Sequence, residues 1–111
     1  MNPSEAQTIE ELVRRALAPY EQRPDAEGVA HLVDDLITAG NGLHTAVARI
    51  PTDKRTERAG AALAEWAYFL DAGPLGHGDH ANWNHARGLA RIVRTMAATL
   101  AEQQQHRAGA R

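Results

Sequence analysis

Three of the six histidines lie close together in one glycine-rich segment. His77, His80 and His85 are separated by three and five residues, and Asp79 stands between the first two. Imidazole and carboxylate groups at such spacings can hold a metal ion. However, the metal ion itself would have to order a segment this rich in glycine, which makes a metal site less favourable. We therefore expect no metal site and no cofactor, and the simpler interpretation places these histidines in a solvated loop and the first turn of a helix.

A stripe of aromatic and cationic side chains follows in the same region. At about 100° per residue, His80, Trp83, Arg87, Arg91 and Arg94 fall on one narrow side of a helix, roughly 120° from the centre of its apolar face. Such a stripe offers stacking surface, hydrogen-bond donors and fixed positive charge to an anionic or peptide ligand. The alternative is a solvated arginine face, with Trp83 packed at its edge or in a subunit contact.

Two further ionisable residues are candidates for acid–base chemistry. His44 lies on the rim of the apolar stripe of the second helical segment, where a histidine can act as a general base. The alternative is a half-buried histidine satisfied by a backbone or carboxylate partner. Glu65 and Phe69 share one shoulder of the third segment, and Arg58 is too far along the helix to hold Glu65 firmly. Glu65 is therefore free to meet an arginine of the fourth segment.

Several well-known functional motifs do not fit this sequence. The glycines of residues 73–78 follow a helical segment rather than a strand, so they lack the context of a phosphate-binding loop or a dinucleotide fingerprint. No pair of short helices forms a DNA-recognition unit. The absence of cysteine excludes disulfides, thiolate metal sites and a cysteine nucleophile.

The elements that position these residues are predicted to be helices throughout. Apolar residues recur at spacings of three and four, and no stretch alternates with a period of two. We expect an all-α bundle of about four helices in a single domain, residues 1–111, with residues 103–111 forming a frayed tail. The first helix has two possible N-caps, Asn2 and Thr8, because each precedes a glutamate by three residues.

The second helix is expected to be unusually long. Asp25 is its predicted N-cap, and one apolar phase continues from Val29 to Ile50 across the Gly-Asn-Gly of residues 40–42. These glycines can mark a close crossing by another helix or a kink. Thr52 is the predicted cap of the third helix. Residues 73–74 (Gly-Pro) end it, and the fourth starts near Asp79 or Asn82.

Composition limits both the size of the core and the choice of partners. The chain has 111 residues, and Leu, Ile, Val and Phe together make up less than a fifth of them, so we expect a thin core and a homodimer. A formal net charge of −2 disfavours nucleic acid and anionic membranes as partners. With no apolar run long enough to span a membrane and no signal-peptide pattern, we expect a cytoplasmic protein.

The carboxy-terminal two thirds resemble a known group of proteins. The stretch L-H-T-A-V-A-R-I-P-T-D, the helix end E-W-A-Y-F-L-D-A-G and the later H-A-R-G-L-A-R-I-V-R-T-M resemble short actinobacterial proteins described only as natural-product biosynthesis proteins. The size, the lack of cysteine, the all-helical pattern and the histidine-rich loop are more narrowly similar to the small lysinoalanine-forming enzymes of duramycin- and cinnamycin-type lanthipeptide pathways.

The narrower resemblance implies an aza-Michael addition, in which a lysine amine of a modified lanthipeptide precursor attacks a dehydroalanine. The substrate's own hydroxyaspartate carboxylate would assist, and the protein would mainly orient the peptide in a groove of the homodimer. On this hypothesis, the expected catalytic residues are His44 and Glu65. The expected substrate-binding residues are Trp66, Phe69, His80, Trp83, Arg87 and Arg91.

Two other functions are compatible with the sequence. One is a non-catalytic helical dimeric adaptor or regulator of a natural-product cluster, which would dock its partner through the arginine stripe. The other is a small-molecule immunity or carrier protein with a pocket under Trp66 and Trp83.

Overall fold

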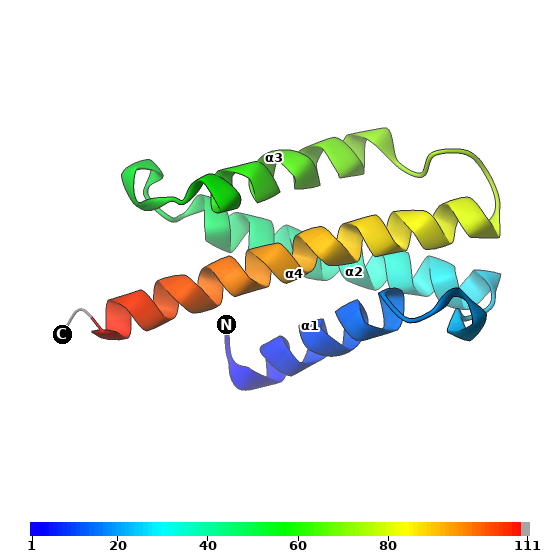
Figure 1. The fold of residues 1–111 in the computed structure, drawn as a ribbon, viewed down its shortest axis with the longest axis horizontal. Helices are drawn as coiled ribbons and strands as arrows, with labels where there is room; N and C mark the ends of the chain where they lie inside the picture. Colours follow the sequence, from blue (N-terminus) through cyan, green and yellow to red (C-terminus); the bar gives the residue numbers. More distant parts are fainter. Residues whose placement is uncertain (110–111) are drawn as a thin grey trace.

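The protein is described here by a computed structural model, which covers the backbone of residues 1–109 and the side chains of residues 1–105. Within this part the chain forms four α-helices and two short 3₁₀ turns, without a strand (Figure 1). The helices are α1 (Pro3–Ala16), α2 (Ala26–Ala48), α3 (Glu57–Ala72) and α4 (Asp79–Gly109), and the turns are Tyr20–Gln22 and Thr52–Lys54. The expectation of an all-α bundle of about four helices is confirmed.

The first three helices each begin at a residue whose side chain accepts a hydrogen bond from the first turn. Asn2 accepts from the amide of Glu5 at 2.8 Å, and Asp25 accepts from the amide of Gly28 at the same distance. Both residues were among the caps predicted from the sequence. Such caps satisfy amides that have no partner inside the helix.

The predicted cap of α3 is wrong by four residues. Thr56, not Thr52, accepts from the amide of Ala59 at 3.0 Å, and residues 52–54 form a 3₁₀ turn. The physical reason lies in Arg55, whose guanidinium donates to the carbonyls of Ala48 and Ile50 at 3.0 Å each. This contact satisfies carbonyls at the C-terminal end of α2. It uses Arg55 in the connection between the helices, so α3 begins only after Thr56. The end of α3 is as predicted, at Gly73 with a φ of 66°.

Helix α2 runs without interruption through residues 40–42, which explains its length of 23 residues. A Cβ added to Gly40 would lie 2.0 Å from Cη2 of Trp66, so the indole of α3 occupies the space above this glycine. The indole Nε1 also donates to Oδ1 of Asn41 at 3.1 Å. The prediction that these glycines mark a close crossing is therefore confirmed for Gly40. Gly42 differs, because nothing lies within 4 Å of its added Cβ.

Helix α4 forms the centre of the bundle and contacts each of the other three helices (Figure 1). Its buried side chains include Leu89, Val93 and Met96, which pack with Leu32 and Leu36 of α2. The backbone of residues 103–109, expected as a frayed tail, continues α4. No helix in the described part of the chain combines the length and the apolarity needed to cross a membrane.

The two glycines of α2 provide a matched test of this packing. We expect Gly40→Ala to lower the free energy of unfolding by about 1–3 kcal/mol, because the new methyl group collides with a buried indole. Gly42→Ala should raise it by about 0.5–1 kcal/mol, since alanine favours the helix and meets no neighbour. Urea unfolding followed by circular dichroism measures both values. A loss of stability that is equal in the two variants would contradict the assigned helix crossing.

Candidate functional site

The ligand-binding wall predicted on α4 is not formed as a continuous surface. Trp83 is only 1% exposed and belongs to the hydrophobic core, so its side chain cannot cover a ligand in this structure. Arg87 is half-buried, whereas His80 and Arg91 are exposed. Exposure of His80 and Arg91 is compatible with both alternatives, so for these two residues the prediction stays open. Neither alternative describes Trp83 and Arg87, because both side chains make contacts inside the fold.

Arg87 of α4 is hydrogen-bonded to the backbone at the C-terminal end of α1. Its guanidinium Nη1 donates to the carbonyl of Ala18 at 2.8 Å and to that of Ala16 at 3.4 Å, and it lies 5.8 Å from the centroid of the Trp83 ring. The last carbonyls of a helix lack partners inside the helix and carry partial negative charge, which a cation stabilises. Arg87 thus has a structural role in this arrangement, and its expected role of holding substrate carboxylates stays a prediction.

His80 contributes to an exposed group where the connection between α1 and α2 meets the start of α4. Its ring meets that of Tyr20 edge to face at 5.6 Å, and its Nε2 lies 3.2 Å from Nδ2 of Asn84. The guanidinium of Arg23 lies 3.8 Å from the centroid of the Tyr20 ring. Tyr20 and Arg23 carry no signal in the sequence that marks them as part of a site, because only the fold brings them beside α4.

The two expected aromatic contacts on α3 are mainly structural. Trp66 is 1% exposed over Gly40, and Phe69 is half-buried against α4, where a Cβ on Gly88 would lie 2.4 Å from its Cε1. The Phe69 ring also stacks on His85, with centroids 6.0 Å apart and an interplanar angle of 12°. Trp66 and Phe69 therefore join the helices rather than line an open site.

His85 is a buried histidine that the sequence analysis placed with the solvated ones. It is 7% exposed, and burial lowers its pKa because the charged imidazolium is desolvated. Its position could have been found from its spacing, since His85, Leu89, Ile92 and Met96 follow each other at intervals of four, three and four on the buried side of α4. Neutral His85 is therefore part of the packing between α3 and α4.

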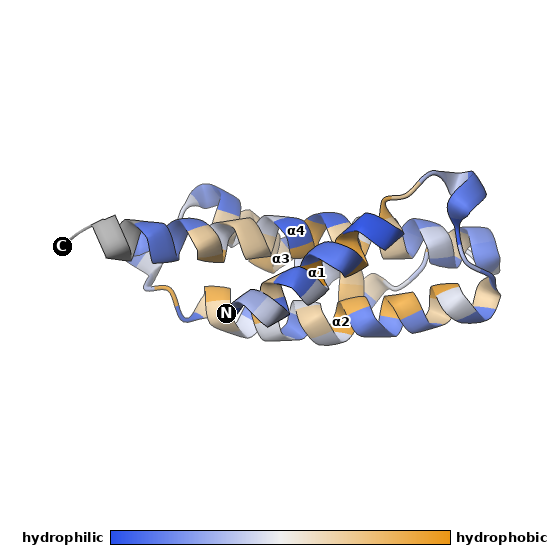
Figure 2. Cartoon of the chain, turned by 90° about the horizontal axis from the view of Figure 1, so that it is seen from below, coloured by the Kyte–Doolittle hydropathy of each residue, from blue (hydrophilic) through white to orange (hydrophobic). Residues whose placement is uncertain are grey.

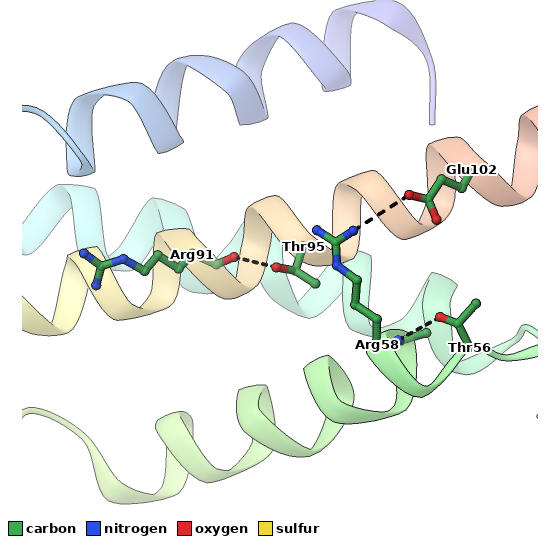
Figure 3. Close-up of polar contacts among 6 residues, drawn as sticks. Thr56, Arg58, Arg91, Thr95 and Glu102 are labelled. Carbon is green, nitrogen blue, oxygen red and sulfur yellow. Dashed lines mark hydrogen bonds and ion pairs between the residues drawn. The ribbon is translucent and has the colours of Figure 1, made fainter.

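The predicted catalytic pair is not assembled into a recognisable site. His44 is half-buried on α2 and Glu65 is exposed on α3, and no hydrogen bond or ion pair among the described side chains joins them. Glu65 was expected to meet an arginine of the fourth segment, but the ion pair between α3 and α4 is formed by Arg58 and Glu102 at 3.8 Å (Figure 3). Figure 3 also shows the hydroxyl of Thr95, which donates a hydrogen bond to the carbonyl of Arg91 within α4. Both partners of the ion pair are about 60% exposed, so it contributes little to stability.

Within the residues that the structure describes, no three histidine or carboxylate side chains gather where they could hold a metal ion. His77 and His80 are exposed, whereas His85 is buried in the core. The three histidines of the glycine-rich segment therefore do not form such a group.

Two concave surfaces lie on either side of α1, whose outer face is largely hydrophilic in Figure 2. The α1–α2 groove has a volume of about 750 Å³, and its apolar lining includes Ile9, Leu12, Ala39, Leu43, Ala46 and Leu100. The α1–α4 groove has a similar volume of about 750 Å³, and its apolar lining includes Ile9, Val13, Leu17, Ala97, Ala98 and Ala101. None of the eight predicted site residues lines either groove.

The chain belongs to DUF6415, a family of unknown function whose model matches residues 7–105. The match spans most of α1, all of α2 and α3, and α4 as far as residue 105. Searches of curated proteins and of solved structures gave no match. The function must therefore be inferred from the geometry of this chain.

The structural role of Arg87 predicts a stability effect. We expect Arg87→Ala to lower the free energy of unfolding by about 1–3 kcal/mol, because the carbonyls of Ala16, at the end of α1, and of Ala18, just past it, lose a charged donor. Arg91→Ala is the matched control on the same helix and should change it by less than about 0.5 kcal/mol, since that side chain is exposed. Denaturant unfolding measures both, and equal effects would contradict the assignment.

The burial of His85 predicts a stability that falls at acidic pH. The unfolded chain binds a proton on this residue near its ordinary pKa of 6.5, whereas the folded chain resists it to a lower pH. The free energy of unfolding should therefore decrease as the pH falls below about 6.5. His85→Phe preserves an aromatic ring beside Phe69 and should reduce this slope. An unchanged slope between pH 7.5 and 5 in urea unfolding would rule out the contribution of His85.

Proposed function

We propose that this member of DUF6415 is a non-catalytic helical adaptor that docks an apolar segment of a partner protein alongside α1. The observation that carries the proposal is the pair of apolar grooves flanking this helix, each with a volume of about 750 Å³. Such a volume falls within the range of ligand sites, roughly 300–1,000 Å³. Apolar surface in a concave site gains free energy when a partner removes it from water.

The arrangement of α1 explains why both grooves exist. This helix has 14 residues, whereas α4 beside it has 31, so α1 covers only part of the surface that α4 and α2 present. Ile9, Leu12 and Val13 anchor its inner side in the core, and Arg87 holds its C-terminal end. The apolar margins of α2 and α4 on either side of α1 are left for a partner.

From the sequence, an adaptor was expected to dock its partner through the arginine stripe. The geometry favours the grooves beside α1 as the docking surface. Arg87 is engaged by α1, and of the stripe only Arg94 lines a groove. A carrier protein with a pocket under Trp66 and Trp83 has no support in this arrangement, because both indoles are 1% exposed within the core.

The lysinoalanine-forming activity implied by the resemblance stays a prediction, as do the homodimer and the cytoplasmic location. Its expected catalytic residues, His44 and Glu65, carry no contact in the described structure that sets them apart from other side chains of the same kind. A thiol-trapping assay on a dehydroalanine-containing lanthipeptide core, with and without the protein, tests it: ring closure consumes the alkene, so the thiol adduct should disappear only when the protein is present.

Site-specific photocrosslinking tests the adaptor proposal. A benzoylphenylalanine is placed at Thr38 in the α1–α2 groove, at Ala98 in the α1–α4 groove, and at the exposed Ala64 of α3 as a control. We expect one defined partner protein to be crosslinked in the native cells from at least one groove position, and not from residue 64. Absence of a product from both grooves, or equal products from all three positions, would contradict the proposal.

A further inference from the structure

We propose that the α1–α2 groove binds an amphipathic α-helix whose apolar stripe is flanked by lysine or arginine. This inference rests on the proposed adaptor function and specifies the chemistry of the partner. It is drawn from the shape of the groove, from the backbone that lines it and from the charges at its rim.

The shape of the groove provides room for a closely packed helix. On α2, the residues that line it include Ala39, Gly42 and Ala46, which succeed one another at intervals of three and four and so lie on one side of the helix. A Cβ on Gly42 would meet nothing within 4 Å, whereas the corresponding space at Gly40 is filled by Trp66 of α3. The same helix thus has one glycine covered by a bulky side chain and another that is open in the groove.

The groove favours a helical occupant over an extended one. Its lining residues lie almost entirely on α1, α2 and α4, whose backbone amides and carbonyls are bonded within those helices. An extended segment would bury its own backbone groups without partners, which is costly, whereas a helix satisfies them internally. The α2 lining extends from Asp35 to Ala46, about 16 Å at 1.5 Å per residue, which matches roughly three helical turns.

The charges at the rim determine the sign of the partner. The charged side chains that line the α1–α2 groove are Glu5 and Asp35, and both are exposed carboxylates. Glu5 accepts a hydrogen bond from the neutral amide of Asn2, which leaves its charge uncompensated, and the amino group of Met1 offsets at most one of the two charges. The α1–α4 groove differs because Arg14 and Arg94 line it together with Glu10. Complementarity therefore assigns a cationic helix to the α1–α2 groove.

The test uses a fluorescein-labelled model helix of 14 residues with a leucine and alanine stripe flanked by lysines. A second peptide carries glutamate in place of each lysine. In fluorescence anisotropy with the full chain, we expect the lysine peptide to bind at least tenfold more tightly than the glutamate peptide. The difference should shrink at high salt, because the rim carboxylates are exposed and therefore screened.

Matched variants locate the binding site. Asp35→Lys should weaken binding of the lysine peptide at least fivefold, whereas Asp34→Lys, the same charge change on the adjacent residue outside the groove, should alter it less than twofold. Gly42→Leu should abolish binding by filling the groove, with the fold verified by circular dichroism. Ala101→Leu places the same side chain in the α1–α4 groove and should leave binding unchanged.

The possible failures separate this inference from the adaptor proposal. Equal affinities of the two peptides, or equal effects of Asp34→Lys and Asp35→Lys, would overturn the selection by charge. Binding blocked by Ala101→Leu but not by Gly42→Leu would place the helix in the other groove, and self-association lost in Gly42→Leu would identify the occupant as a second copy. Each result overturns this inference, and so does failure of both peptides to bind. The photocrosslinking experiment decides the adaptor proposal independently.

Discussion

The bundle depends on two aromatic side chains of α3 that are seated over glycines of its neighbours. Trp66 fills the space above Gly40 of α2, and Phe69 fills the space above Gly88 of α4. In a chain with few large aliphatic residues, these contacts bring three helices together at short range and bury a large apolar area per residue. They also place His85 against Phe69, and the hydrogen bond from Trp66 to Asn41 fixes α3 along α2.

The attachment of α1 is of a different kind, and the proposed function follows from it. This helix is held by a short apolar side and by the guanidinium of Arg87 at its C-terminal end. Its sequence contains neither an aromatic residue nor a glycine, and it is much shorter than α4. The apolar margins on both sides of α1 are therefore only partly covered, which leaves one groove with acidic side chains at its rim and one with mixed charge.

The sequence predicted the elements well because their signals are local. The cap Asp25, the stop at Gly73 and the continuity of α2 through residues 40–42 each depend on nearby residues, whereas the sequence left Asn2 and Thr8 open as caps of α1 and the structure shows Asn2. The start of α3 was missed because Arg55 bonds to carbonyls five and seven residues away. The surroundings of the candidate site residues on α4 were predicted less well, since a helical wheel describes one helix alone. Helix α4 is contacted by three others, so its buried face is wider than one stripe and includes Trp83, while the partners of Arg87 lie about 70 residues away.

The groove between α1 and α2 is proposed to bind a cationic amphipathic helix. The most direct measurement is a titration of ¹⁵N-labelled protein with the lysine-flanked peptide, followed by amide chemical shifts. The account predicts that the largest shifts occur at groove residues such as Thr8, Thr38, Gly42 and Ala46, with the outer face of α3 around Ala64 unchanged. Largest shifts along α3 or around Ala98 and Ala101, or no shifts at saturating peptide, would contradict it.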